Sequence, residues 1–305
     1  MASKIDYTQR VLTFERDYDG PVVATLLRSV TTEKSKAVLY IHGYTDYFFQ
    51  DHLAQEFINR GYCFYALDLR KYGRSLIKGQ HPNFCRSMRE YYPEITQSIE
   101  IMAQDGFHKI VLLGHSTGGL LAALYANDGP MKSHLSHLVL NSPFFEFNTT
   151  WCKRHIQIPL AGIFSLFLPF VHSAPELSRW YAQSIHKDFK GEWDFNRQWK
   201  PIEGFPLYFA WLRAISLAQK ELRGGLNIKC HILVMSSDHS VAGKQWHEGF
   251  RNGDAVLRVN HIEKEVSSLG RDVIYTQIKN GVHDLFLSAK DAREKAIEVM
   301  FNFLK

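Results

Sequence analysis

The sequence predicts an α/β protein with a mostly parallel central sheet and a helical insertion between two of its strands. Short, continuous apolar runs alternate with segments of helical pattern toward both ends of the chain, and a long stretch between them lacks this alternation. Apolar strands that alternate with helices are typical of a parallel sheet buried on both faces. With 305 residues, 45% hydrophobic and 22% charged, the chain has the composition of a globular protein with a large core.

The chain opens with a predicted β-hairpin. Its strands are Arg10–Glu15 and Pro21–Val30, both rich in β-branched and apolar residues. Asp19-Gly20 lies between them, and glycine accepts the positive φ angle of a tight hairpin turn at little cost. We therefore expect an antiparallel pair before the parallel strands begin.

Strands and helices then alternate. Apolar runs bounded by polar turns predict four strands, and the segments between them have apolar residues at helical spacing. The predicted strands are Lys36–Ile41, Tyr62–Leu67, Lys109–Leu113 and His137–Leu140. The predicted helices are Asp51–Asn59, Arg89–Gln104 and Gly118–Ala126.

The alternation stops after Asn141 and resumes near Lys229. Residues 144–226 are rich in aromatic residues and leucine, contain several prolines and show no strand pattern. The later elements are a strand at Lys229–Met235, a helix at Val259–Leu269, a strand at Asp272–Ile278 and a helix at Ala292–Leu304. The predicted organisation is a first part of the sheet domain (1–143), a helical insertion (144–226) and a second part of the sheet domain (227–305).

Charge, cysteine spacing and the first residues narrow the class of protein. A formal net charge of +5 is too small to indicate a nucleic-acid partner. The four cysteines stand far apart, so they form neither a disulfide framework nor a zinc motif and suit a reducing compartment. The opening sequence MASKIDYTQR lacks the apolar core of a secretory signal. We expect a cytoplasmic protein.

The strongest chemical signal is a serine between a strand and a helix. Gly114-His115-Ser116-Thr117-Gly118 fits G-x-S-x-G, follows a predicted strand and opens an Ala/Leu-rich helix. Such a sharp turn needs residues without Cβ two positions before and after the serine, because a side chain there would meet the backbone. The turn raises the Ser116 hydroxyl above the carboxyl edge of the sheet, where the helix N-terminus offers N–H groups to an anion.

This motif resembles that of the α/β-hydrolases, and the chain is most similar to the branch of monoacylglycerol lipases, lysophospholipases and S33-type serine aminopeptidases. The resemblance covers residues 20–143 and 227–305, and the insertion takes the place of the family's helical cap. It implies a serine hydrolase that cleaves carboxylic esters of monoacylglycerol or lysophospholipid type through an acyl-enzyme on Ser116, without a metal or organic cofactor. The alternatives are an S33-type aminopeptidase and a binding module whose hydrolase site no longer catalyses the reaction.

The same resemblance implies the base and the oxyanion donors. His283 follows the last predicted strand, where the family has its histidine base. Histidine titrates near neutrality, so it can take the serine proton and return it to the leaving group. His42-Gly43-Tyr44, which ends the first parallel strand, is similar to the family's H-G-x turn. The resemblance therefore makes the backbone N–H groups of Tyr44 and Thr117 the oxyanion donors.

Two aspartates compete for the role of triad acid. Asp238 comes directly off the strand Lys229–Met235, which is one place where the acid is expected. Asp254, in Gly-Asp-Ala-Val-Leu, is more similar to the family's D-x-V-[VL] signature and leaves one helix and one strand before His283. We favour Asp254 and keep Asp238 as the alternative; the first choice makes residues 237–252 a local insertion.

The insertion contains the residues on which substrate choice depends. The apolar stretch Ile158–Val171 lines an acyl pocket, touches a lipid surface or forms ordinary core, and the sequence leaves these readings open. The expected partner is a small acyl ester, with possible peripheral lipid contact through the cap. An aminopeptidase would need an acid in the insertion to hold the substrate amine. The acids available are Glu176, Glu192, Asp194 and Glu203.

A further motif, Asp68 to Ser75, resembles the family's D-x-R-x-x-G-x-S, to which we assign a structural role. The same region is basic, with Lys71, Arg74, Lys78 and Arg86. These side chains either face solvent or attract a phosphate-bearing or fatty-acid substrate.

Overall fold

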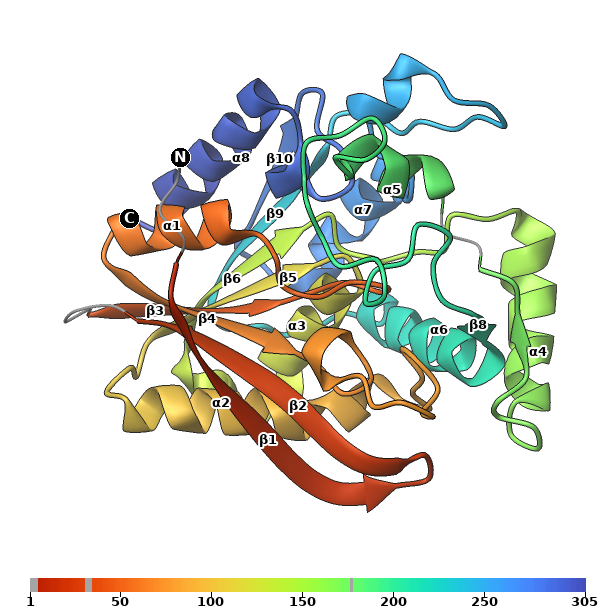
Figure 1. Ribbon diagram of the computed structural model, residues 1–305, viewed down its shortest axis with the longest axis horizontal. Helices are drawn as coiled ribbons and strands as arrows, with labels where there is room; N and C mark the ends of the chain where they lie inside the picture. Colours follow the sequence, from red (N-terminus) through yellow and green to blue (C-terminus); the bar gives the residue numbers. More distant parts are fainter. Residues whose placement is uncertain (1–4, 31–34, 176–177) are drawn as a thin grey trace.

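The computed structural model describes residues 5–30, 35–175 and 178–305. A central twisted sheet has helices on both faces, and a group of helices lies to one side of it (Figure 1). In the described residues one eight-stranded sheet has the order β1-β2-β4-β3-β5-β6-β9-β10. The fold class expected from the sequence is confirmed.

The N-terminal hairpin forms the antiparallel edge of this sheet. Strands β1 (Tyr7–Asp17) and β2 (Gly20–Ser29) pair with each other, and β2 pairs antiparallel with β4. The remaining strand pairs of the sheet are parallel. Their strands are β3 (Lys36–Ile41), β4 (Tyr62–Asp68), β5 (Ile110–His115), β6 (Leu135–Asn141), β9 (His231–Ser237) and β10 (Val273–Ile278).

The register of the parallel strands aligns their carboxyl ends. Ile41 of β3 pairs with Gly114 of β5, and His115 of β5 pairs with Asn141 of β6. Asn141 pairs in turn with Met235 of β9. Because these residues lie at or near the carboxyl ends of their strands at one edge, the loops that follow them meet above that edge.

Helices cover both faces of the sheet. Helices α1 (Asp51–Asn59) and α8 (Lys290–Phe303) meet on one face, where the rings of Phe57 and Phe301 are 4.8 Å apart. The other face carries α2 (Tyr92–Gln104), α3 (Thr117–Asp128) and α7 (Val259–Glu265). Nearly every side chain of α3 is buried, which explains why its sequence TGGLLAALYAND lacks a polar stripe.

The insertion folds into α4 (Ile158–Phe164), α5 (Arg179–Ile185) and α6 (Phe209–Arg223), with a π-helical turn at Lys153–Gln157 before α4. It also contains two-residue strands, β7 (His172–Ser173) and β8 (Leu207–Tyr208), which pair antiparallel. The expectation of no strand in the insertion is therefore wrong at this point. Two residues are too few to produce an alternating pattern, so the sequence carries no signal for them.

Two helices end or begin differently from the prediction. The segment expected as one helix from Arg89 starts with the 3₁₀ turn Met88–Tyr91, and α2 begins at Tyr92 with Pro93 in its first turn. Proline is tolerated there because its missing N–H has no partner inside the helix. Similarly, α7 ends in the 3₁₀ turn Val266–Leu269.

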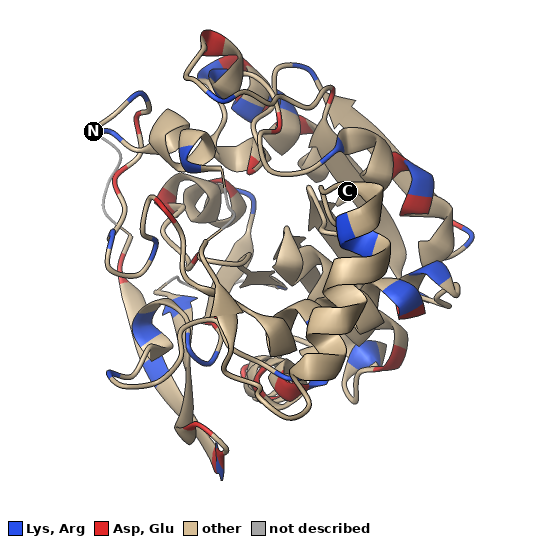
Figure 2. Cartoon of the chain, turned by 90° about the vertical axis from the view of Figure 1, so that its right-hand side faces the viewer, with Lys and Arg blue, Asp and Glu red and all other residues tan. Residues whose placement is uncertain are grey.

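Acidic and basic residues are interspersed along the ribbon on the side of the molecule seen in Figure 2, rather than gathered in one region. Within the described ranges, every helix is too short or too polar to cross a lipid bilayer.

Candidate active site

Ser116 lies on a strained turn between β5 and α3. Its φ and ψ angles are 54° and −117°, a region that residues with a side chain rarely occupy. A Cβ at Gly118 would lie 2.2 Å from the carbonyl oxygen of His42, so only glycine permits this approach of α3 to the turn after β3. The strained serine and the close helix together raise the hydroxyl above the carboxyl edge of the sheet.

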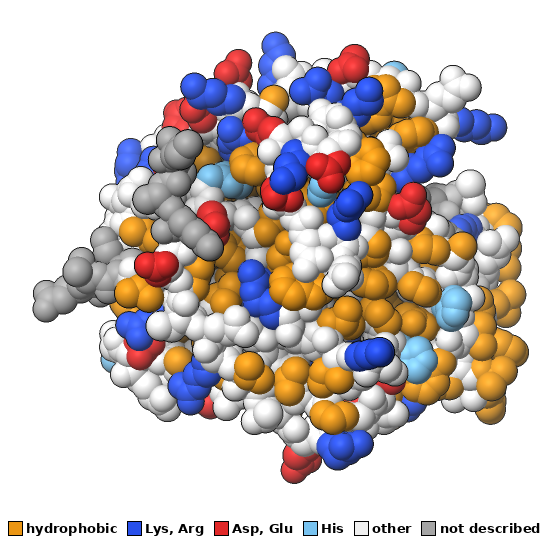
Figure 3. Space-filling model, viewed as in Figure 1, with side chains coloured by type: hydrophobic (Ala, Val, Ile, Leu, Met, Phe, Trp, Pro, Cys, Tyr) orange, Lys and Arg blue, Asp and Glu red, His pale blue; other side chains and the backbone are white. Residues whose placement is uncertain are grey.

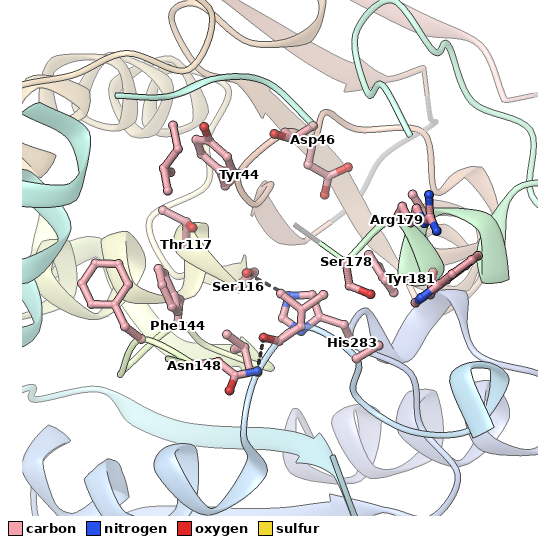
Figure 4. Close-up of a pocket in the computed structure, with 18 of the residues that line it drawn as sticks. Tyr44, Asp46, Ser116, Thr117, Phe144, Asn148, Ser178, Arg179, Tyr181 and His283 are labelled. Atoms are coloured by element: carbon pink, nitrogen blue, oxygen red, sulfur yellow. Dashed lines mark hydrogen bonds between the residues drawn. The ribbon is translucent and has the colours of Figure 1, made fainter. Parts of the chain in front are cut away.

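Three of the residues expected at the site form one hydrogen-bonded chain. The Ser116 Oγ lies 2.9 Å from His283 Nε2, and His283 Nδ1 lies 2.9 Å from Asp254 Oδ2. Because an ionised carboxylate only accepts, His283 Nδ1 donates to Asp254 and Nε2 is left to accept from the serine hydroxyl. All three side chains are buried. The Ser116–His283 contact is drawn as a dashed line in Figure 4.

Asp254 and Asp238 have different surroundings. The second carboxylate oxygen of Asp254 accepts the N–H groups of Val256 and Leu257, both at 2.8 Å. Asp238 is partly exposed and accepts from the Nδ1 of His239 at 2.8 Å and from the N–H of Asn280 at 3.0 Å. The structure thus joins Asp254 to His283 and places Asp238 directly after β9, where it contacts the turn that follows β10.

The loop that bears His283 is held by a residue that sequence reasoning did not single out. Asp284 is buried, and its carboxylate accepts from Asn141 Nδ2 at 2.8 Å, Gln50 Nε2 at 3.0 Å and the N–H of Phe286 at 3.0 Å. The donors come from the end of β6, the start of α1 and the loop itself. In the sequence, the one feature that could have pointed to Asp284 is its position directly after the proposed base, His283.

The turn after β3 packs directly against the nucleophile. A Cβ at Gly43 would lie 3.0 Å from the Ser116 Cβ. Burial lowers the pKa of His42, so the neutral ring accepts the Leu69 N–H on Nε2 at 3.1 Å and donates from Nδ1 to the Gly43 carbonyl at 2.8 Å. Among the described residues, the N–H groups of Tyr44 and Thr117 have no acceptor, so both are available to a ligand.

A pocket of about 490 Å³ lies above Ser116 and is walled by both the sheet domain and the cap. Figure 4 shows Tyr44, Thr117 and Phe144 on one side of the serine, with Ser178 and Tyr181 of the cap on the other. Its larger apolar lining residues are Phe144, Phe147, Ile158, Ile202, Leu207, Trp211, Leu212, Val256 and Leu257. Its charged lining residues are Asp46, Lys153, Arg179 and Lys200. The pocket therefore suits a ligand with a sizeable apolar part.

The acids expected to anchor a substrate amine lie elsewhere. Glu192 pairs with Arg293, and Asp194 pairs with Lys187. Glu203 is exposed and does not line the pocket, and Glu176 lies outside the described residues. The acid that does line the pocket in the described part of the chain, Asp46, is paired with Lys200.

Two cations of the basic segment after β4 are paired within the protein, whereas Lys78 and Arg86 are exposed. Lys71 is buried against Asp17 and Asp19, at 2.9 and 3.3 Å, which contradicts the expectation that it faces solvent or a substrate. Arg74 pairs with Asp68 at 2.8 Å. The Asp68 carboxylate also accepts the N–H groups of Phe48 and Arg74, so this aspartate joins two loops below the pocket.

A protein-family model described as serine aminopeptidase, S33, matches residues 32–188 of the chain. Curated relatives include the 1-acylglycerol-3-phosphate O-acyltransferase ABHD5 of Sus scrofa, 40% identical over 81 residues, which are 26% of this chain and 22% of that protein. The Rattus norvegicus protein of the same name is 31% identical over 127 residues, which are 41% of this chain and 34% of that protein. The matches thus span 22% and 34% of the length of these two relatives.

Solved structures match over nearly the whole chain at low sequence identity. A monoacylglycerol lipase from Paleococcus ferrophilus is 17% identical, with a TM-score of 0.68 and 98% of each chain covered. A soluble variant of monoglyceride lipase from Saccharomyces cerevisiae, in complex with a substrate analogue, is 15% identical, with a TM-score of 0.66 and 97% and 96% of the two chains covered. At these identities the likeness concerns the fold.

Proposed function

Because the chain belongs to the serine aminopeptidase S33 family of α/β-hydrolases, we propose that it is a serine hydrolase that cleaves carboxylic esters through an acyl-enzyme on Ser116. The observation that carries the proposal is the hydrogen-bonded chain from Ser116 through His283 to Asp254 at the base of a largely apolar pocket. A nucleophile, a base within hydrogen-bond reach and a group that orients the base are the parts that acyl transfer requires.

The reaction follows from this geometry. His283 Nε2 takes the Ser116 proton as the serine oxygen bonds to the ester carbonyl carbon, and the N–H groups of Tyr44 and Thr117 stabilise the resulting oxyanion. His283 then returns the proton to the departing alkoxide, which leaves the acyl group on Ser116. Water, activated by His283, releases the acid and restores the serine. Asp254 holds the imidazole tautomer and stabilises its charged form.

The pocket favours esters over peptides with a free N-terminus. An aminopeptidase has to balance the charge of the substrate ammonium, and an unpaired buried cation is costly. In the described part of the pocket wall, the carboxylate of Asp46 already has Lys200 as its partner at 2.8 Å, and the remaining charged groups are cations. The ester group and its acyl chain bring no positive charge to this wall.

The apolar lining supports an ester with a long acyl chain and one polar end, as in monoacylglycerols or lysophospholipids. Each buried CH₂ group contributes about 0.8 kcal/mol to binding. The names of the relatives and of the solved structures refer to acylglycerols, which agrees with this substrate class.

An exposed apolar surface on the cap supports delivery of such substrates from lipid. We call it the apolar ridge: Trp151, Ile156, Leu160, Ile163, Phe164, Leu166, Phe167 and Leu168, each 45–80% exposed. It accounts for the hydrophobic side chains gathered over α4 at the right of Figure 3. Ile158 at the start of α4 lines the pocket, so ridge and pocket share one helix. Contact of the ridge with a lipid surface would bring the pocket close to the substrate.

A fluorophosphonate probe and a set of model substrates test the proposal. We expect the probe to label Ser116 in the folded wild-type protein and not in Ser116→Ala, and p-nitrophenyl acyl esters to turn over faster than amino-acyl anilides. Faster anilide turnover would favour the aminopeptidase. Absence of labelling in folded wild-type protein would favour a binding module without catalysis.

A further inference from the structure

Four consecutive residues that follow the H-G turn all contact one segment of the cap, residues 196–211. The Tyr44 hydroxyl donates to the Pro206 carbonyl at 2.9 Å, and its ring lies 4.3 Å from that of Trp211. The Thr45 Oγ1 accepts from the Phe205 N–H at 3.5 Å. Asp46 forms an ion pair with Lys200 at 2.8 Å, and the Tyr47 hydroxyl accepts the Asn196 N–H at 2.7 Å.

These contacts fix a strained stretch of backbone. Thr45 has a φ of 50°, and on the core side it is held by Asn83, whose Oδ1 accepts its N–H at 3.1 Å and its hydroxyl at 3.2 Å. A non-glycine residue keeps such a conformation only where its neighbours impose it. The backbone N–H of Tyr44, directly before this residue, is one of the two proposed oxyanion donors. Its direction therefore depends on core and cap together.

The ion pair between Asp46 and Lys200 is the charged member of this set. The two residues are 2% and 5% exposed and 154 positions apart in the sequence. Rings of Phe49, Tyr181 and Phe195 surround the ammonium, with centroids 5.8–5.9 Å from Nζ. An ammonium packed among rings and bound to a carboxylate is desolvated and has one favourable position.

The direction of the pKa shift of Asp46 agrees with a permanent ion pair. Burial by itself would raise the pKa of Asp46, but the adjacent Lys200 ammonium and the nearby His115 and His42 lower it below the usual value. The carboxylate thus stays charged and paired throughout the neutral range.

We infer that Lys200 is a positioning residue for the oxyanion turn: by pairing with Asp46, it lets the cap hold the Tyr44 N–H in the direction that stabilises the transition state. This inference rests on the proposed function, because it assigns a role within the same ester hydrolysis. In this role the ion pair directs the Tyr44 N–H toward the oxyanion as long as the cap is packed against the core. A group that acts in this way changes the rate of the chemical step more than the affinity for the substrate.

The competing role for Lys200 is direct contact with the substrate. Its ammonium lines the pocket, but one side is bound to Asp46 and others face the three rings. A direct contact would add binding energy in the ground state as well as in the transition state, so its loss would raise KM.

The test compares Lys200→Met, Asp46→Asn and the double variant with the wild type. The double variant leaves no unpaired buried charge, so it folds even where a single change does not. The control is Arg89→Met, which removes the ion pairs of Arg89 with Glu221 of α6 and Asp128 of α3 at a cap–core contact outside the pocket wall. The measurements are kcat and KM for a p-nitrophenyl ester and the Ki of a trifluoromethyl ketone analogue of that ester.

We expect the double variant to lose about 10- to 100-fold in kcat, somewhat less than the loss of a whole oxyanion donor. Its KM should stay within about threefold of the wild type, and the Ki of the ketone should rise in parallel with the loss in kcat, because the ketone adduct needs the same donors. The control should keep the wild-type kcat.

Two outcomes overturn the inference while the proposed function stands: unchanged kcat and Ki in the double variant, or a raised KM with kcat preserved. If the folded wild type neither binds the fluorophosphonate nor turns over esters, the proposed function itself fails, and the role of Lys200 fails with it.

Discussion

His283 Nδ1 lies 2.9 Å from Asp254 Oδ2, and Asp254 reaches it from the end of a loop that leaves β9 and folds back beside it. The Asp254 N–H donates to the His239 carbonyl, and the Val241 N–H donates to the Asp254 carbonyl, so the two ends of the loop are joined. The residues between them bulge outward. The acid therefore occupies the end of β9 in space although it follows that strand by many positions in sequence.

Asparagine substitutions at the two aspartates separate their roles. Asp254→Asn should reduce kcat for an acyl ester by about 10⁴-fold, because an amide favours the wrong imidazole tautomer. Asp238→Asn should stay within about threefold of the wild type, since that carboxylate holds a turn. Steady-state kinetics on both variants measure this. A larger loss at position 238 than at 254 would reverse the assignment.

Local sequence patterns explain why part of the site could be predicted. The strand-to-helix turn at Ser116 depends on glycines within two positions, and the sheet register places the turn after β3 and the loop after β10 at the same edge. The glycine spacing around Ser116 can be recognised because its residues lie within two positions of the serine. The similarity of Gly-Asp-Ala-Val-Leu to the family's D-x-V-[VL] signature favoured Asp254. Asp238 stayed open as the alternative, because a local pattern does not record the course of the loop between β9 and Asp254.

The contacts between cap and core could not be predicted. Lys200 and Asp46 are joined by the packing of an insertion without clear periodicity, and each alone looks like a surface charge in the sequence. Lys71 shows the same limit, because burial against the hairpin turned an apparent surface lysine into part of an internal ion cluster. Long-range pairing of charges depends on tertiary structure, and local sequence patterns do not indicate which charged residues will be paired and buried.

Asp284 should support both catalysis and stability. In Asp284→Asn an amide N–H₂ faces either Gln50 Nε2 or the pair of donors from Asn141 and Phe286, so at least one buried donor loses its acceptor. We expect unfolding free energy to fall by about 1–3 kcal/mol and kcat by about tenfold as the His283 loop loosens. Urea denaturation and ester kinetics measure the two effects.

The matched control is Asp291→Asn, an exposed acid in the first turn of α8. It should change the unfolding free energy by no more than about 0.5 kcal/mol. Equal effects at positions 284 and 291 would contradict the role assigned to the buried carboxylate.

The pocket should impose a limit on acyl chain length. For p-nitrophenyl esters, kcat/KM should rise up to about fourfold per added CH₂ until the apolar wall is filled, and then level off. Leu212→Trp should shift the optimum to shorter chains, because Leu212 is buried in the wall. Leu217→Trp, on the same helix but 49% exposed, serves as the control. An optimum that moves equally in both variants would place the acyl group elsewhere.

The apolar ridge should matter for lipid-bound substrates and not for dissolved ones. Replacing Leu160 and Phe167, which are 60% and 80% exposed, by serine removes apolar surface without opening the core. We expect about 10- to 100-fold weaker binding to phospholipid vesicles, and a comparable loss of turnover on emulsified monoacylglycerol. Turnover of a short, soluble p-nitrophenyl ester should be unchanged, since the pocket is intact. Vesicle sedimentation and the two assays measure this, and Val11→Ser on strand β1, where the side chain is 55% exposed, serves as the control. Equal vesicle binding by the ridge variant and the wild type would show that lipid contact does not involve this surface.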